Sequence, residues 1–307
     1  MRIVSLLPAA TEIVCALGLA DDLVGISHGC DFPPGVAGRP VVTGADPAVV
    51  GAPARRVHEL AAAAERGGGR ALATLDGELL AALRPDLVLV GGSPAAGSSL
   101  EAGRVRAAVG PNASIVTLEP SSLEGIFHAI ATVGAMTDAE DEAVGLVEIL
   151  RERLADVEEM VEERREVGHR APRVVALEWL DPPESAGLWV PEQIRRAGGW
   201  EVLADDGEPG RTTAWEAVAD VDPEMILLVP RGLHLADVVR AWRASPRPRD
   251  WSEIAAVRRG QVFALDASSY FSRPGPRVID GIEILAEIFD PAGFVDLAPA
   301  GSWVPVQ

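Results

Sequence analysis

The sequence predicts an α/β protein in which two lobes, each a parallel sheet flanked by helices, are joined by one long α-helix. Three observations support this prediction: a length of 307 residues, a proline-free amphipathic stretch in the middle of the chain, and similar segments on either side of that stretch. A chain of this length is too long for one simple core. We expect an N-terminal lobe over 1–136, a connecting helix over 137–168 and a C-terminal lobe over 169–307.

Composition and charge exclude several classes of protein. Apolar residues make up 48% and charged residues 24%, which is typical of a folded globular protein. The net charge of −19 repels phosphate backbones and excludes a nucleic-acid-binding protein. The two cysteines, Cys15 and Cys30, cannot build a disulfide framework and form no zinc-type pattern. No apolar run is long enough to span a membrane.

The N-terminal residues indicate a folded element instead of a signal peptide. Arg2–Leu6 reads as a strand and Ala9–Leu17 as a helix started by Pro8. Thr11 and Glu12 interrupt the apolar run that a secretory segment needs. We therefore expect a cytoplasmic protein, or a periplasmic or extracellular one if a leader has been lost.

The middle of the chain predicts one long amphipathic helix. No proline occurs from Thr137 to Val167. Apolar residues recur every three to four positions, at Ala143, Leu146 or Val147, Leu150, Leu154, Val157 and Val161. Thr137 and Asp138 can cap the start of the helix, and Gly168 can end it. A solvated helix within one domain is the alternative; we favour a rigid connector because the flanking halves resemble each other.

The two halves share a pattern of segments. Residues 2–6 (RIVSL) resemble 173–177 (RVVAL), and 84–90 (RPDLVLV) resemble 222–229 (DPEMILLV). A Gly/Pro loop and a further strand, 114–118 or 261–265, follow in each half. Continuous apolar runs separated by helices indicate parallel strands buried on both faces. We infer two small α/β lobes related by duplication.

Two facing α/β lobes place the carboxyl ends of their strands, and the loops that follow, along one shared cleft. In the first lobe these loops are Pro8, 27–34 and 91–99, which include Ser93. In the second lobe they are 179–190, 230–234 and 267–277, and the first of these includes Trp179 and Trp189.

The sequence contains no motif for catalysis. It lacks a G-x-S-x-G nucleophile elbow, a Walker loop and an H-E-x-x-H pair. The five histidines are scattered, with none at metal-ligand spacing to another. We expect a protein that is not an enzyme and requires no cofactor.

Two loops stand out as candidate binding segments. Residues 27–34 (SHGCDFPP) present Ser27 together with the imidazole of His28, the thiol of Cys30 and the carboxylate of Asp31. This set could contact a metal-bearing ligand or coordinate its metal. In the alternative reading Asp31 caps the turn, Phe32 packs and Cys30 fills space.

The second loop, 269–277 (SYFSRPGPR), precedes the C-terminal helix. The rings of Tyr270 and Phe271 could cover a flat ligand, and Arg273 could meet a carboxylate or amide edge. Alternatively, Pro276 starts the helix and the two aromatic side chains fasten it to the lobe.

Residues 6–13 (LLPAATEI), 24–27 (VGIS), 30–34 (CDFPP), 84–89, 197–199 (AGG) and 270–277 together resemble a known family. This family is the cobalamin-binding proteins among the substrate-binding proteins of ABC transporters, in the class of helical-backbone metal receptors. The resemblance covers nearly the whole chain. It implies two Rossmann-like lobes joined by one long helix, with a corrinoid, haem, siderophore or metal bound between them.

The resemblance also implies site residues. It places Asp31, Phe32 and Pro33 in one wall of the cleft, and Trp179, Tyr270 and Phe271 in the other. Family members dock on a permease through one surface glutamate per lobe, and by position these are Glu101 and Glu216.

The chain departs from the vitamin B12 receptor of this family in three places. Gly91–Pro94 replaces a tryptophan after the P-D-L-V strand, residues 46–75 form an insertion rich in alanine and glycine, and no export signal or lipoprotein cysteine is present. A leaderless branch is therefore the better comparison. We expect capture of a corrinoid such as cobalamin, with an ABC permease as partner if transport is the role. The alternatives are a receptor for haem, an iron siderophore or a metal, and a cytoplasmic enzyme or chaperone that handles a corrinoid or tetrapyrrole.

Overall fold

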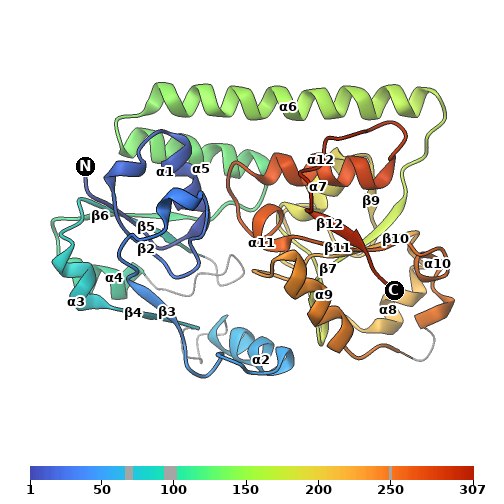
Figure 1. Cartoon of the computed structure of the whole chain (residues 1–307), viewed down its shortest axis with the longest axis horizontal. Coiled ribbons are helices and arrows are strands. Elements are labelled where there is room, and N and C mark those ends of the chain that lie inside the picture. Colours follow the sequence, from blue (N-terminus) through green and yellow to red (C-terminus); the bar gives the residue numbers. More distant parts are fainter. Residues whose placement is uncertain (66–71, 93–101, 249–250) are drawn as a thin grey trace. The chain divides into compact units, whose positions relative to one another are not determined.

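The computed structural model describes residues 1–65, 72–92, 102–248 and 251–307 (Figure 1). The chain forms two compact units. Unit 1 comprises Met1–Pro120 and Glu124–Glu148, and unit 2 comprises Ser121–Leu123 and Ile149–Gln307. The boundary between them falls within the longest helix, so this helix contributes residues to both units.

Unit 1 is built on a four-stranded parallel sheet in the order β2-β1-β5-β6. Its strands are β1 (Ile3–Ser5), β2 (Leu23–Ile26), β5 (Leu87–Gly91) and β6 (Ser114–Leu118). The helices are α1 (Pro8–Ala16), α3 (Gly77–Ala82), α4 (Ala102–Val109) and α5 (Leu123–Met136), whose first residue belongs to unit 2. The predicted insertion carries α2 (Ala54–Glu65) and β4 (Ala73–Leu75), and β4 pairs antiparallel with β3 (Thr43–Ala45), which directly precedes the insertion.

Unit 2 repeats the same parallel core in the order β9-β7-β10-β11. These strands are β7 (Arg173–Leu180), β9 (Trp200–Glu201), β10 (Met225–Leu228) and β11 (Val262–Leu265). Two antiparallel strands are added, β8 (Pro183–Ser185) on β7 and β12 (Trp303–Pro305) on β11. The helices are α7 (Val190–Arg196), α8 (Trp215–Asp220), α9 (Leu235–Ala244), α10 (Ala255–Arg258), α11 (Ala267–Tyr270) and α12 (Val278–Phe289).

The predicted similarity of the two halves extends to individual hydrogen bonds. Asp86 accepts the backbone N–H of Arg2 at 2.8 Å, and Glu224 accepts that of Arg173 at 3.0 Å. In return, Asp86 donates its backbone N–H to the carbonyl oxygen of Arg2 at 2.8 Å. Glu224 donates its backbone N–H to the carbonyl oxygen of Arg173, also at 2.8 Å. The pair β1 and β5 in unit 1 and the pair β7 and β10 in unit 2 are therefore joined in the same way at their amino ends.

The predicted long helix is α6 (Glu140–Glu166). Its 27 residues would extend about 40 Å at 1.5 Å per residue. It begins three residues later than expected, because Thr137 donates its hydroxyl to the carbonyl oxygen of Val133 at the end of α5, and Asp138 has a positive φ of 53°. Its last residue is Glu166, and Gly168, the predicted terminator, follows two residues later with a φ of +95°.

The second half of α6, which belongs to unit 2, has a buried apolar face. Leu150, Leu154, Val157 and Val161 are all buried, as the apolar spacing predicted. Among the described residues, no helix combines the length and the apolar character needed to cross a membrane. In α6, glutamates and arginines occupy the positions between the apolar residues.

Candidate functional site

The loop after β2 lies at the carboxyl end of the unit 1 sheet and packs on the start of α1. The Sγ atom of Cys30 lies 3.0 Å from Oγ1 of Thr11 and 3.2 Å from Oγ of Ser27. Thr11 and Ser27 are both buried. A Cβ atom added at Gly29 would lie 3.3 Å from Cγ of Pro8. The thiol of Cys30 is therefore turned toward the protein interior.

His28 has the opposite orientation. It is exposed, and both its backbone N–H and its ring contact Thr43 in β3. Oγ1 of Thr43 accepts the backbone N–H of His28 at 2.9 Å and lies 2.7 Å from Nδ1 of the ring. Partial desolvation lowers the pKa of His28, so the neutral imidazole dominates at pH 7.

The next residues of the loop continue along the surface. Asp31 is exposed, Phe32 is 39% exposed and Pro33 is half-buried. The predicted contact residue Ser93 and the predicted docking residue Glu101 lie outside the described residues. Within the described part of the chain, no group of three or more His, Cys, Asp or Glu side chains is arranged to hold a metal ion.

The carboxyl end of the unit 2 sheet presents two of the predicted aromatic residues. Trp179, near the end of β7, is half-buried and donates its Nε1–H to the carbonyl oxygen of Asp181 at 3.1 Å. Tyr270 ends α11, which follows β11, and is also half-buried. The guanidinium carbon of Arg277 lies 5.6 Å from the centre of its ring. Both rings are accessible in part.

Three other predicted contact residues in unit 2 are buried. Trp189 is 3% exposed and donates its Nε1–H to the carbonyl oxygen of Phe271 at 3.0 Å. Phe271 is 2% exposed, and Arg273 is 8% exposed and donates from Nη2 to Oγ of Ser268 at 3.0 Å. These hydrogen bonds are made within unit 2, and contact of the three side chains with a ligand stays a prediction. Phe271 also lies close to α12, since a Cβ atom added at Gly281 would be 3.5 Å from its Cε1, which agrees with the alternative reading that aromatic side chains fasten this helix.

A largely buried charged cluster at the same end of the sheet, in which Glu184 is buried and Glu178 and Arg231 are half-buried, was not expected from the sequence. Arg231, just after β10, lies 2.5 Å from Oε1 of Glu184 and 3.7 Å from Oε1 of Glu178. Desolvation raises the pKa of Glu178 to about 7; the nearby Glu184 adds to this, whereas Arg231 and the N–H of Gly187 oppose it. The three residues come from β7, β8 and the loop after β10, and no local motif connects them.

The predicted docking residue Glu216 is exposed in the first turn of α8. The internal repeat gives it a counterpart in unit 1. This counterpart is Glu78, which is exposed in the first turn of α3. In each unit, the residue six positions after the glutamate has a positive φ: 45° at Arg84 and 38° at Asp222. The repeat therefore pairs Glu216 with Glu78.

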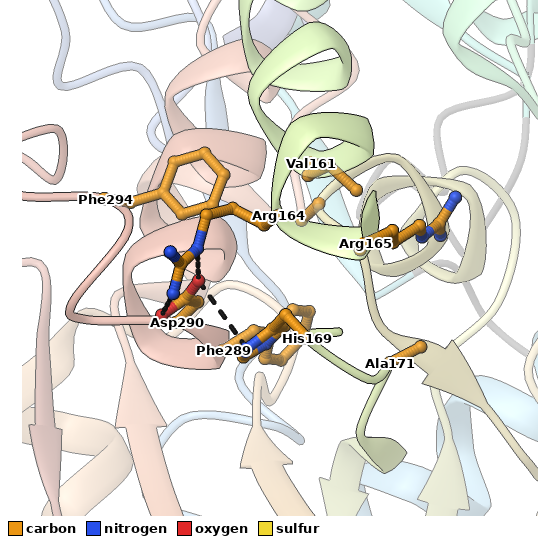
Figure 2. A pocket seen from close by; sticks show the side chains of 10 residues that line it. Val161, Arg164, Arg165, His169, Ala171, Phe289, Asp290 and Phe294 are labelled. Atoms are coloured by element: carbon orange, nitrogen blue, oxygen red, sulfur yellow. Dashed lines mark hydrogen bonds and ion pairs between the residues drawn. The ribbon is translucent and has the colours of Figure 1, made fainter. Parts of the chain in front are cut away.

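A small hollow in unit 2 lies elsewhere. Figure 2 shows the side chains of Arg164 and His169 pointing toward Asp290, with Phe294 beside them. Ala171, two residues before β7, also lines it, so the hollow lies toward the amino end of this strand. It has room for about one water molecule. This hollow is too small for an organic ligand and is separate from the predicted contact residues.

Comparisons with known proteins agree with the two-unit α/β fold. The family model described as "Periplasmic binding protein" matches residues 3–269. The uncharacterised ABC transporter substrate-binding lipoprotein YvrC of Bacillus subtilis (strain 168) is 26% identical over 95% of this chain and 81% of its own. The vitamin B12-binding protein of Vibrio cholerae is 26% identical over 92% of this chain and 86% of its own. The crystal structure of a periplasmic heme-binding protein from Pseudomonas aeruginosa has a TM-score of 0.71 and 21% identity, covering 95% of this chain and 93% of that chain.

Proposed function

Because the chain belongs to the periplasmic binding protein family, we propose that it is a substrate-binding protein of the ABC-transporter type that captures a corrinoid and leaves it chemically unchanged. The observation that carries this proposal is the similarity to the vitamin B12-binding protein of Vibrio cholerae across 92% of the chain. The same proposal includes the expected division of the chain into an N-terminal lobe (1–136), a connecting helix (137–168) and a C-terminal lobe (169–307).

The surface aromatic residues support a broad apolar ligand. Phe32 is exposed in part after β2, and Trp179 and Tyr270 are accessible in part at the carboxyl end of the unit 2 sheet. Covering apolar surface contributes roughly 25 cal/mol per Å², so a few rings can supply much of the affinity. Asp31 adds an exposed carboxylate that can accept hydrogen bonds from the amide groups of a corrinoid.

Titration with cyanocobalamin tests the proposal. We expect heat and a visible absorbance change at micromolar ligand, and we expect Phe32→Ala and Tyr270→Ala each to weaken binding about tenfold, the loss of roughly 1.4 kcal/mol. Trp200→Ala is the matched control, because Trp200 is 58% exposed but pairs with Arg173 at the amino end of β7. Absence of both signals in the wild-type protein would refute a corrinoid ligand.

A haem or iron-siderophore receptor is the second candidate. It is favoured by the exposed imidazole of His28, and the fold similarity to a heme-binding protein is compatible with it. Parallel titrations with ferric haem and a ferric hydroxamate distinguish the ligands by their relative affinities. Mass spectrometry of the recovered ligand tests the remaining alternative, an enzyme or chaperone, since a chemically altered corrinoid would support that reading.

Glu78 and Glu216 form the proposed docking pair for a permease. Both are exposed at the start of short helices that the repeat places in equivalent positions. With a purified corrinoid ABC permease in vesicles, Glu78→Lys and Glu216→Lys should reduce the stimulation of ATP hydrolysis while ligand affinity is unchanged. Glu148→Lys on α6 is the control, because it makes the same charge change at another exposed position. Equal stimulation by all three variants would contradict the pair.

The cellular location also remains a proposal. A cytoplasmic location is the expectation stated above, whereas the name of the Bacillus relative is that of a lipoprotein. Fractionation of the native host, with antibody detection of the protein, decides between these locations.

A further inference from the structure

The loop after β2 contains two side chains that could coordinate the metal of a bound macrocycle, His28 and Cys30. The structure separates them. The thiol of Cys30 lies within 3.0 Å of a hydroxyl of α1 and 3.2 Å of the Ser27 hydroxyl. To reach a ligand outside, Cys30 would have to break these contacts and leave two buried hydroxyl groups without their sulfur partner.

The imidazole of His28 is already oriented outward. Thr43 contacts both the backbone N–H and Nδ1 of this residue, which fixes the backbone and the ring together. No hydrogen bond is made to Nε2 by any residue that the structure describes. The anchor itself lies in a second strand pair, since Thr43 opens β3, which pairs with β4.

This arrangement matches a general feature of metal-binding histidines. Such a histidine usually donates its second ring N–H to an oxygen, which fixes the tautomer and the ring plane. Oγ1 of Thr43 can accept both the backbone N–H and an Nδ1–H, because a hydroxyl oxygen has two lone pairs. The lone pair of Nε2 is then directed away from the anchor.

We propose that His28 coordinates the metal at the centre of a bound corrinoid or haem through Nε2, with Thr43 as its positioning residue. This inference rests on the function proposed above. The step is a ligand exchange: the bond from the metal to an axial water breaks, the bond from Nε2 to the metal forms, and the water leaves. The oxidation state of the metal does not change, and no proton is transferred when His28 is neutral with its hydrogen on Nδ1.

Cobalamins with different axial groups test the proposal. Hydroxocobalamin carries an exchangeable water or hydroxide, whereas the cyanide of cyanocobalamin exchanges slowly. We expect hydroxocobalamin to bind with a shift in its visible spectrum that His28→Ala abolishes, together with a loss of affinity of about tenfold or more. The affinity for cyanocobalamin should change less than about threefold. His128→Ala, which removes an exposed imidazole from α5, is the control. Ferric haem provides the second arm, in which a His28-dependent shift of the Soret band identifies the iron macrocycle as the ligand.

The role of Thr43 has its own readout. Thr43→Val should weaken the shift and move its pH midpoint, whereas Thr43→Ser, which keeps the hydroxyl, should restore both. Two outcomes would overturn the assignment of His28 and leave the proposed function standing. In the first, His28→Ala binds hydroxocobalamin with the full spectral shift. In the second, the shift is lost only in Cys30→Ala. Failure of the wild-type protein to bind either cobalamin or haem would instead overturn the proposed function.

Discussion

Arg164, near the end of α6, and Asp290, directly after α12, form an ion pair in which Nε lies 2.5 Å from Oδ2 (Figure 2). Asp290 is buried, and it also accepts the backbone N–H of Gly293. Burial alone would raise the pKa of Asp290, but the hydrogen bonds from Arg164 and Gly293, with His169 nearby, hold it below its ordinary value. The pair fastens the second half of α6 to the end of α12 within unit 2.

We expect Asp290→Asn to lower the free energy of unfolding by about 2 kcal/mol at pH 7, the usual size of a hydrogen bond to a charged group. Because the folded pKa is lowered, the stabilisation is present above the unfolded pKa of about 3.9 and is lost as the pH falls through the folded value. Urea unfolding at pH 7, 5 and 3.5 should therefore show the difference from wild type shrinking toward acid. Asp220→Asn, at an exposed position of α8, should have little effect at any pH.

Glu178 predicts the opposite pH dependence. Its folded pKa of about 7 lies above the value of an unfolded glutamate, so its contribution is present below about pH 4.5 and is lost as the pH rises through about 7. Glu178→Gln keeps a neutral hydrogen-bonding group beside Glu184. We expect this variant to be more stable than wild type at pH 8 and to lose less stability between pH 5 and 8, by on the order of 1–3 kcal/mol.

Urea midpoints at the two pH values measure this effect, and Glu216→Gln on the surface of α8 is the control. An unchanged pH slope in Glu178→Gln would show that Glu178 is ionised throughout this range, with Arg231 neutralising it.

Two glycines near the junction of α5 and α6 should respond in opposite directions to the same substitution. A Cβ atom at Gly134 would lie 2.5 Å from Cβ of Ala143 and 2.9 Å from the carbonyl oxygen of Ala139, whereas none of the neighbouring atoms lies within 4 Å of a Cβ at Gly145. We expect Gly134→Ala to destabilise the protein by about 1–3 kcal/mol through overpacking. Gly145→Ala should stabilise it by up to about 1 kcal/mol, because alanine favours the helix.

Thermal and urea unfolding of the two variants give the comparison, and each variant serves as the control for the other. Equal effects of the two substitutions would contradict the close approach of α5 and α6 at Gly134.

Much of the fold could be predicted from local sequence patterns. The run of apolar residues in 84–90 and 222–229 predicted the buried strands β5 and β10, and the spacing of Leu150, Leu154 and Val157 predicted the buried face of α6. The similar segments in the two halves predicted the matching strand orders. These features depend on neighbours in sequence, where the periodicity of apolar residues determines which face is buried.

The candidate site was predicted less completely. The two candidate loops follow strands, β2 and β11, as expected, and their contact with a ligand stays a prediction. The sequence could not show that Trp189 and Phe271 are buried or that Arg273 bonds to Ser268. Aromatic and arginine side chains serve equally well in a core and on a ligand surface, so their type does not decide their orientation.

The amino-acid order by itself determined the family, the α/β class and the position of the long helix, because apolar periodicity and short motifs are properties of neighbouring residues. Tertiary structure alone decided which loop side chains face outward. Cys30 is held by Thr11 of α1, 19 residues earlier, and His28 by Thr43 of β3, 15 residues later. Such contacts depend on how segments distant in sequence pack together. The residue type does not decide the orientation: the contact with Thr11 turns Cys30 inward, and the contact with Thr43 holds His28 toward solvent.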